Sequence, residues 1–203
     1  MSSITVTVGW QHALAAMKLP STGFSAQEVN SANDIQSTIS SFHLWHWTLT
    51  AGATIATVAG TQDYSMGAAD QNKVLSIAVA NLLEGSTEQP PLQVSEIMLP
   101  RYTTQGQPFC CGLLSQTQIR MYPNPDAVYT FKWTYYARPV IFTTNAGSYD
   151  CPDTFSNVIF ELNIWKVMQL MDDDRQEKQY EKGIALLSNL RQIEFKTVGR
   201  SRV

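Results

Sequence analysis

The chain has 203 residues, of which 15% are charged, and its formal net charge at pH 7 is −3. Globular domains usually contain about 25% charged residues. A mildly acidic chain with few cations cannot hold nucleic acid by neutralising phosphates, which excludes a tight DNA- or RNA-binding protein. The length allows one domain with a proper core, or a domain that carries a sizeable insertion.

Charge is unevenly placed along the chain. Residues 35–62 contain no Asp, Glu, Lys or Arg, and neither do residues 102–119. A free monomer usually keeps charge over its whole surface for solubility, so these stretches indicate either a large internal core or a surface that faces other protein. The sequence alone leaves both interpretations open.

The cysteines and the apolar segments indicate in which cellular compartment the protein works. Cys110 and Cys111 are adjacent and Cys151 is distant, which is not the spacing of a secreted disulfide framework. The longest apolar run, 74–83, is too short and too interrupted to cross a bilayer. We therefore expect a soluble protein of a reducing cytoplasm, without contact with a membrane.

Helical periodicity marks the amino-terminal end of the chain. Residues 10–19 form a short helix candidate that stops at Pro20. A second helix is expected after Ser25 and Glu28, whose spacing is that of a capping box. Its apolar residues recur at helical spacing up to Phe42, so one of its faces should be buried.

Two further helices are predicted at the carboxy-terminal end. The first follows Pro152, with Asp153 and Thr154 as expected caps, and is apolar on nearly every face. The acids Asp172–Asp174 end it, and an amphipathic helix is expected over 175–195. A nearly all-apolar helix beside an amphipathic one requires further helices to cover it.

The region between these helices alternates with a period of two and is rich in Thr, Val, Ile and aromatic residues, which predicts strands. A β-hairpin or meander is expected over its second half, with the turn at 123–126. The strand candidates lie within 45–66, 73–83, 92–99, 109–114, 117–122 and 128–140.

These elements predict the α+β class: a helical bundle formed by the amino- and carboxy-terminal helices, with an inserted antiparallel β module. The expected boundaries are 1–44 and 150–195 for the bundle, 45–149 for the β module and 196–203 for a flexible basic tail. Helical spacing places these residues in the bundle core: Val29, Ile39, Phe42, Phe155, Leu162, Trp165, Leu187 and Leu190.

No arrangement of side chains predicts catalysis, a metal site or a cofactor site. His43 and His46 could share a helical face, but zinc needs three or four ligands and no third follows at a suitable spacing. Cys110 and Cys111 would point to opposite faces of a strand, and no histidine is placed to act as a base, so core packing is expected. We therefore expect a protein that is not an enzyme.

One strand candidate has an aromatic face formed by Tyr129, Phe131, Trp133 and Tyr135. Aromatic residues on sheet faces usually belong to the core. Exposed, the same face would suit a glycan or a small ligand, as in a binding module of a tail fibre or baseplate. Base stacking is not favoured, because Arg and Lys are not interleaved with these rings.

Several segments, taken as an ordered series, resemble the head-to-tail connector (adaptor) proteins of tailed bacteriophages, the group that includes tail tubular protein A. The resemblance covers about Ser25 to Phe195, and Ser65 and Met66 stand where the family tends to have Leu-Pro. The order of the motifs carries it. The segments are an Asn-rich helix leading into WHW, then TVAGTQDYSM, the LP-RY loop, IRMYPNPDAVYTFKWTYYARP, YDCPDTF and the paired helices.

The resemblance implies a structural virion protein, made in the host bacterial cytoplasm and located in the virion neck. Such proteins dock as a ring, commonly of twelve subunits, beneath the portal and join it to the tail nozzle or tail tube, while DNA passes through the ring. Their carboxy-terminal segment commonly reaches the portal. Lys196, Arg200 and Arg202 are therefore expected to bind the portal in this chain.

Overall fold

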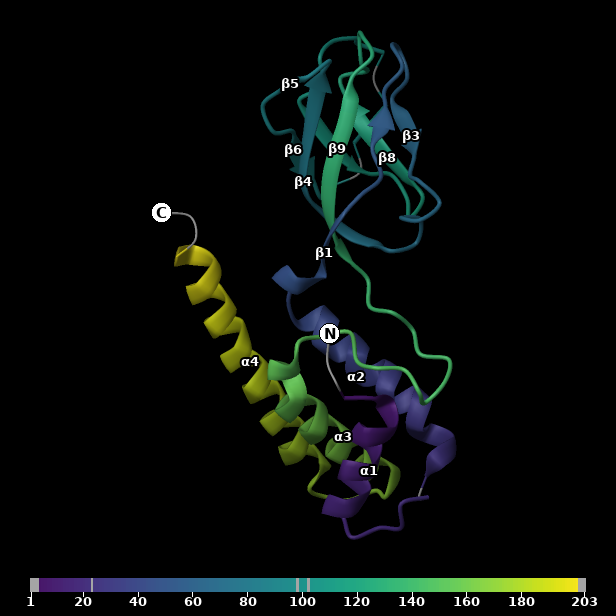
Figure 1. Cartoon of the computed structure of the whole chain (residues 1–203), viewed down its shortest axis with the longest axis vertical. Coiled ribbons are helices and arrows are strands. Elements are labelled where there is room, and N and C mark those ends of the chain that lie inside the picture. The colour runs from purple at the N-terminus through teal and green to yellow at the C-terminus, as the bar shows by residue number, and fades with distance from the viewer. Residues whose placement is uncertain (1–3, 23, 98, 102, 201–203) are drawn as a thin grey trace. The chain divides into compact units, whose positions relative to one another are not determined.

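The structure is a computed structural model that describes residues 4–22, 24–97, 99–101 and 103–200 (Figure 1). It consists of two compact units. Unit 1 is made of Met1–Trp47 and Pro139–Val203, and unit 2 is the continuous segment Thr48–Arg138. Unit 1 contains the α-helices, and the strands of unit 2 form two sheets. This mixture agrees with the predicted α+β class.

Unit 1 is organised around α3, which contacts the three other helices. Because α3 is apolar on several faces, it is covered from several sides, and its Val158, Ile159 and Leu162 have no more than 1% of their surface exposed. The α-helices are α1 (Val6–Ala16), α2 (Glu28–Phe42), α3 (Ser156–Leu170) and α4 (Gln176–Arg200).

The two amino-terminal helices begin differently from the prediction. α1 starts at Val6 because the Thr5 hydroxyl accepts the Val8 N–H at 3.2 Å, which supplies a cap several residues before the predicted start. The predicted capping box of Ser25 and Glu28 is not formed. Ser25 begins a 3-10 turn, and the Glu28 side chain is buried instead of reaching back to the helix start.

The predicted caps of α3 belong to a separate turn. Asp153 and Thr154 lie in the 3-10 turn Asp153–Phe155, where the Asp153 backbone carbonyl accepts the Ser156 hydroxyl. The sequence pattern could not distinguish a 3-10 turn from the first turn of an α-helix, because both use small polar residues to satisfy free N–H groups.

α4 continues through Arg200, where the sequence predicted an end near 195 and a flexible tail from Lys196. Extending a helix that already exists adds one hydrogen bond for each residue fixed, and no proline interrupts this segment. Arg202 lies outside the described residues.

Residues 139–149 belong to unit 1, although the sequence pattern assigned them to the β module. Their backbone is paired with the bundle. The Val6 N–H donates to the Gly147 carbonyl at 2.9 Å. The Asn33 side chain donates to the Phe142 carbonyl at 3.0 Å and accepts the Phe142 N–H at 2.7 Å. An irregular segment held in this way has no periodicity that would reveal its place.

Unit 2 contains two sheets. The first has the strand order β1-β9-β4-β5, with β2 also paired to β9, and the second has the order β3-β8-β7-β6. The strands are β1 (Leu49–Ala51), β2 (Ile55–Ala56), β3 (Asp63–Ser65), β4 (Val74–Glu84), β5 (Thr87–Glu88), β6 (Gln93–Ser95), β7 (Cys110–Leu113), β8 (Gln118–Tyr122) and β9 (Thr130–Ala137).

The two sheets share one hydrophobic core, to which the first contributes Leu82 and Phe131 and the second contributes Ile119 and Met121. Two details differ from the predicted antiparallel module. β6 runs parallel to β7, because the long segment between them returns the chain before β7 begins, and alternation does not encode strand direction. β8 and β9 lie in different sheets, so the predicted hairpin across 123–126 is not formed.

The aromatic face of β9 lies inside this core. Phe131, Trp133 and Tyr135 have between 0% and 3% of their surface exposed. The Trp133 indole donates to the Ala53 carbonyl at 2.9 Å. Gly52 leaves room for that ring, since a Cβ there would lie 2.1 Å from it. Buried and hydrogen-bonded, this face is not available to a glycan or another ligand.

Candidate protein-interaction sites

The eight residues predicted for the bundle core are brought together in one cluster of unit 1. Ile39, Phe155, Leu162 and Leu187 are buried in it. The other four pack against it and are partly buried: Val29, Phe42, Trp165 and Leu190. This cluster fixes α4 against α3 and so determines where the polar face of α4 lies.

The tryptophan pair of the WHW motif also serves this core. The Trp45 ring lies edge-on to Phe155 with centroids 4.9 Å apart, and Trp47 approaches the same ring at 5.9 Å. The Trp45 indole donates to the Ile39 carbonyl at 2.7 Å. The motif therefore packs the carboxy-terminal end of α2 against the start of α3.

The carboxy-terminal part of α4 is attached to the end of α2 through Glu194. Its carboxylate accepts the His46 backbone N–H at 2.6 Å and lies 3.3 Å from the His43 imidazole. The His43 ring also lies 5.2 Å from the Phe195 ring. The two histidines considered as metal ligands thus position a helix, and the described residues contain no cluster that could hold a metal ion.

Beyond this attachment, the end of α4 is exposed. Ile193 and Phe195 have 59% and 56% of their surface exposed, and Arg191 and Lys196 are exposed as well. The Arg191 guanidinium lies over the Phe195 ring at 5.5 Å. Of the three predicted portal-binding cations, the structure therefore places Lys196 on this exposed end and Arg200 at the last residue of α4.

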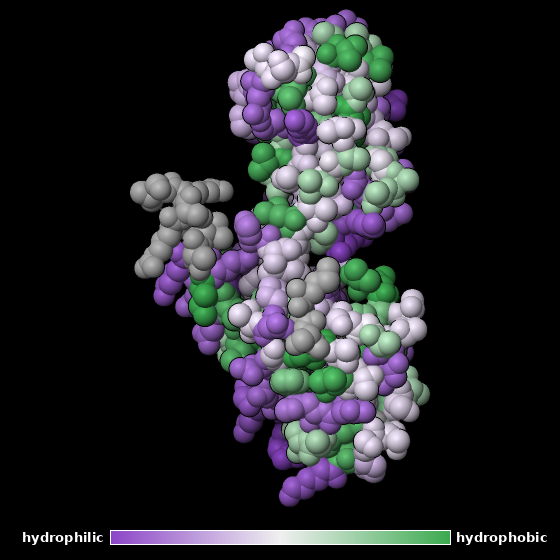
Figure 2. All heavy atoms as spheres, viewed as in Figure 1, coloured by the Kyte–Doolittle hydropathy of each residue, from purple (hydrophilic) through white to green (hydrophobic). Residues whose placement is uncertain are grey.

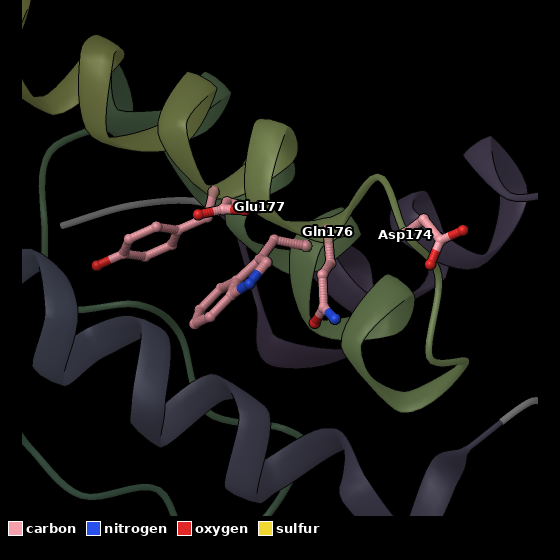
Figure 3. Close-up of a pocket in the computed structure, with 5 residues that line it drawn as sticks. Asp174, Gln176 and Glu177 are labelled. Carbon is pink, nitrogen blue, oxygen red and sulfur yellow. The ribbon is translucent and has the colours of Figure 1, made fainter.

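A depression of about 460 Å³ lies where α3 turns into α4 (Figure 3). It is lined by Trp165 of α3 and by Asp174, Gln176, Glu177 and Tyr180. The Trp165 and Tyr180 rings are 4.6 Å apart and inclined at 46°. The Lys166 ammonium lies 4.4 Å from the centre of the Trp165 ring, so this ring already attracts one cation.

Sequence reasoning missed this depression. Trp165 was expected only in the core, and Asp172–Asp174 only as a helix boundary. The available signal was the charge distribution along α4. Residues 172–181 contain five acids and two cations, whereas residues 191–202 contain four cations and one acid. The two ends of the helix therefore carry opposite net charge, −3 and +3.

The two uncharged stretches of the sequence meet at one end of unit 2. The Gly60 N–H donates to the Pro125 carbonyl at 2.7 Å, and the Gly106 N–H donates to the Asn124 carbonyl at 2.9 Å. Val58, which precedes this contact, has 58% of its surface exposed. Figure 2 shows hydrophobic residues gathered at this end, near the loop that precedes β3. Other residues of the same stretches are buried in the two cores, as the first interpretation expected, whereas contact of the exposed part with other protein stays a prediction.

A buried ion pair in unit 2 was not predicted. Arg120, which has 5% of its surface exposed, donates to both oxygens of Asp63 at 2.6 and 2.9 Å. Its third bond, to the Leu99 carbonyl at 2.7 Å, holds the segment that follows β6. The hydrogen bond from Arg120 lowers the pKa of Asp63 below its ordinary value. This pair supports the fold of unit 2 rather than a ligand.

The thiols are placed inside the protein. Burial raises the pKa of Cys111 and of Cys151 to about 12, so neither carries a thiolate at neutral pH. Cys110 is also buried. Among the described residues, no helix is long and apolar enough to cross a membrane.

The described residues thus present three surfaces: an exposed basic end of α4, an acidic and aromatic depression at its other end, and the end of unit 2 where the two uncharged stretches meet. The chain matches the SU10 adaptor protein family over residues 15–202, which covers all of unit 2 and most of unit 1. A comparison with curated proteins finds no match. The resemblance to phage head-to-tail adaptors is confirmed at this level. The chain therefore belongs to the SU10 adaptor protein family and is a phage adaptor protein.

Proposed function

We propose that this protein is a structural component of the virion neck that assembles as a ring beneath the portal and joins the portal to the tail. The observation that carries the proposal is membership of a phage adaptor family over nearly the whole chain. The ring, commonly of twelve copies in the resembling proteins, would leave a channel for DNA. A net charge of −3 suits a channel wall that must let DNA pass.

The partners in this proposal are the portal, the tail nozzle or tail tube, and further copies of the chain itself. Lys196, Arg200 and Arg202 at the end of α4 would bind acidic side chains of the portal. Support comes from the exposure of Lys196 and from the attachment of Glu194, which holds this end in a defined position. Many weak contacts of this kind become strong when they act together on a ring.

The proposal assigns no enzymatic activity. It is supported by the placement of the candidate nucleophiles, because buried thiols with a raised pKa are poor nucleophiles at neutral pH. The alternative of a glycan-binding module rested on the aromatic face of β9, and burial of that face removes its basis.

Deletion of Lys196–Val203 tests the portal contact. We expect the deletion to remove only the helical signal of Lys196–Arg200 from the circular dichroism spectrum, because the core of unit 1 ends before Lys196, and to abolish attachment to portal-containing heads. A matched control carries Thr197→Ala and Ser201→Ala, which alters the same segment but keeps its charges, and it should attach normally. Unimpaired attachment of the deletion variant would refute the portal-binding role of this segment.

Electron microscopy of purified virions tests the function as a whole. A ring of this protein is expected between portal and tail, and immunogold particles directed against unit 2 should label the neck. Virions that lack the protein at that position, while retaining portal and tail, would exclude the proposed role.

A further inference from the structure

We propose that the depression at the α3–α4 turn is the site where one copy of this chain receives the basic end of α4 from a neighbouring copy, with Arg191 as the inserted cation. The inference rests on the proposed ring and names the surfaces through which copies contact each other. The depression consists of Trp165, Asp174, Gln176, Glu177 and Tyr180.

The lining of the depression suits a cationic side chain. The lining combines two carboxylates, from Asp174 and Glu177, with an aromatic pair, and Asp174 lies apart from the other lining residues (Figure 3). Within the described part of the chain, neither carboxylate forms an ion pair, although Asp173 next to them is paired with Arg175 at 2.6 Å. A guanidinium can stack on an aromatic face and donate to a carboxylate at the same time, so arginine fits this combination better than lysine.

The opposite end of the same helix supplies such a group. Arg191 is exposed, lies over the Phe195 ring and has no carboxylate partner among the described residues. Lys196 lies on another face of α4, since five residues correspond to a rotation of about 140°. Arg191 can therefore enter a neighbour while Lys196 stays available for the portal.

The two ends cannot satisfy each other within one copy. Glu177 and Arg191 are both on α4, separated by about 21 Å at 1.5 Å per residue. Their opposite charges, −3 over 172–181 and +3 over 191–202, are therefore complementary only between copies. A contact between two different patches is heterologous, and repetition of it closes into a ring when the rotation between copies allows.

Charge reversal tests the contact on the full-length protein. Glu177→Arg places a cation in the depression, and Arg191→Glu places an acid on the inserted end. Each change alone replaces attraction by repulsion and should weaken association between copies on portal particles by about tenfold. The double variant, and a mixture of the two single variants, should regain wild-type association within about threefold, because opposite charges then meet again.

The readout is the number of copies per portal particle, measured by mass photometry over a range of protein concentrations. Glu96→Arg and Lys132→Glu are the matched controls: they make the same kinds of charge change at exposed residues of unit 2, outside both charged segments of α4, and should assemble as the wild type does. Should a single variant fail to fold by circular dichroism, the wild type is titrated with salt, which should weaken association between copies.

The outcomes separate this inference from the proposed function. Wild-type protein that never binds portal would refute the function. Wild type that fills a ring on portal, while both reversals fill it equally well or the double variant stays defective, would refute the contact alone. Assembly that stops at a closed pair of copies would overturn the head-to-tail arrangement, and salt-independent assembly of the wild type would overturn the ionic contact.

Discussion

Arg120 shows what one buried charge does for unit 2. Its guanidinium joins the strand pair β3–β8, through Asp63, to the segment after β6, through the Leu99 carbonyl. A charge removed from water is tolerated only where hydrogen bonds replace its hydration, and Arg120 makes three of them. The residue therefore ties the strand pair β3–β8 to a loop that no strand pairing joins to it.

Replacing Arg120 by Met should lower the free energy of unfolding by about 3 kcal/mol, because it leaves Asp63 without its buried partner and the Leu99 carbonyl without a donor. Urea unfolding measures the change. Arg101→Met is the control, since Arg101 lies 3.6 Å from the same carboxylate but its side chain is 81% exposed, and its removal should cost little. A loss below about 1 kcal/mol for Arg120→Met would show that water replaces the pair without penalty.

The buried thiols make stability sensitive to alkaline pH. Their ordinary pKa is 9.0, and burial raises that of Cys111 and Cys151 to about 12. A raised folded-state pKa means that the unfolded chain loses its thiol protons first. The stabilising contribution is therefore complete below pH 9 and is lost as the pH rises from 9 towards 12.

We accordingly expect the free energy of unfolding to fall through this alkaline range when it is measured by urea titration at successive pH values. The double variant Cys111→Ala/Cys151→Ala lacks both thiols and should show a shallower fall. Tyr135, whose pKa burial raises to about 12, remains in that variant and accounts for part of the residual slope. Identical slopes for the two proteins would contradict a role for the thiols.

At the scale of elements, the packing of α3 against α4 stabilises unit 1. Gly183 of α4 faces Leu162 so closely that a Cβ at this glycine would lie 2.6 Å from the leucine side chain. The absence of a side chain at Gly183 lets the two helices approach, and Leu162 fills the space between them without any exposed surface. Packing of this kind leaves no room for rearrangement.

Leu162→Ala should therefore lower the free energy of unfolding by about 2 to 5 kcal/mol, the usual cost of removing a fully buried leucine. Leu170→Ala is the control on the same helix, because Leu170 has 39% of its surface exposed and should cost far less. Thermal or urea unfolding of the isolated protein decides between them. An effect below about 1 kcal/mol at Leu162 would mean that α3 gains its stability from a partner.

The helices were predictable because burial of one face imposes a period on the sequence, and Leu162 and Leu187 follow that period. The caps were less predictable, since the Thr5 hydroxyl and the turn before Ser156 depend on where neighbouring segments pass. Strand positions were also visible, but the pairing of β6 with β7 and the separation of β8 from β9 were not. Alternation records which face is buried and contains no information about the partner strand.

The candidate sites were predictable only where sequence neighbours act together. Lys196 and Arg200 stand out as a basic end in any reading of the chain. The depression at the α3–α4 turn combines Trp165 with Glu177 and Tyr180, which lie on different helices, and only the packing of α3 on α4 brings them together. Glu194 likewise gains its role from two histidines about 150 residues earlier in the chain, at 43 and 46.

At the scale of the whole molecule, unit 2 is one continuous segment with a hydrophobic core of its own. We expect the isolated segment Thr48–Arg138 to fold, because its core residues all come from within it. The measurement is far-UV circular dichroism with a cooperative thermal transition. Phe131→Ala in the same segment should abolish or strongly weaken that transition, since Phe131 is fully buried. A segment that remains unfolded would show that unit 2 depends on the helices.

The strands through which the chain enters and leaves unit 2 are hydrogen-bonded neighbours, with Leu49 opposite Tyr136. The chain therefore leaves unit 2 next to the point where it enters, so two neighbouring chain segments connect unit 2 to unit 1. A different domain whose two ends lie equally close could replace unit 2 without moving α2 away from α3.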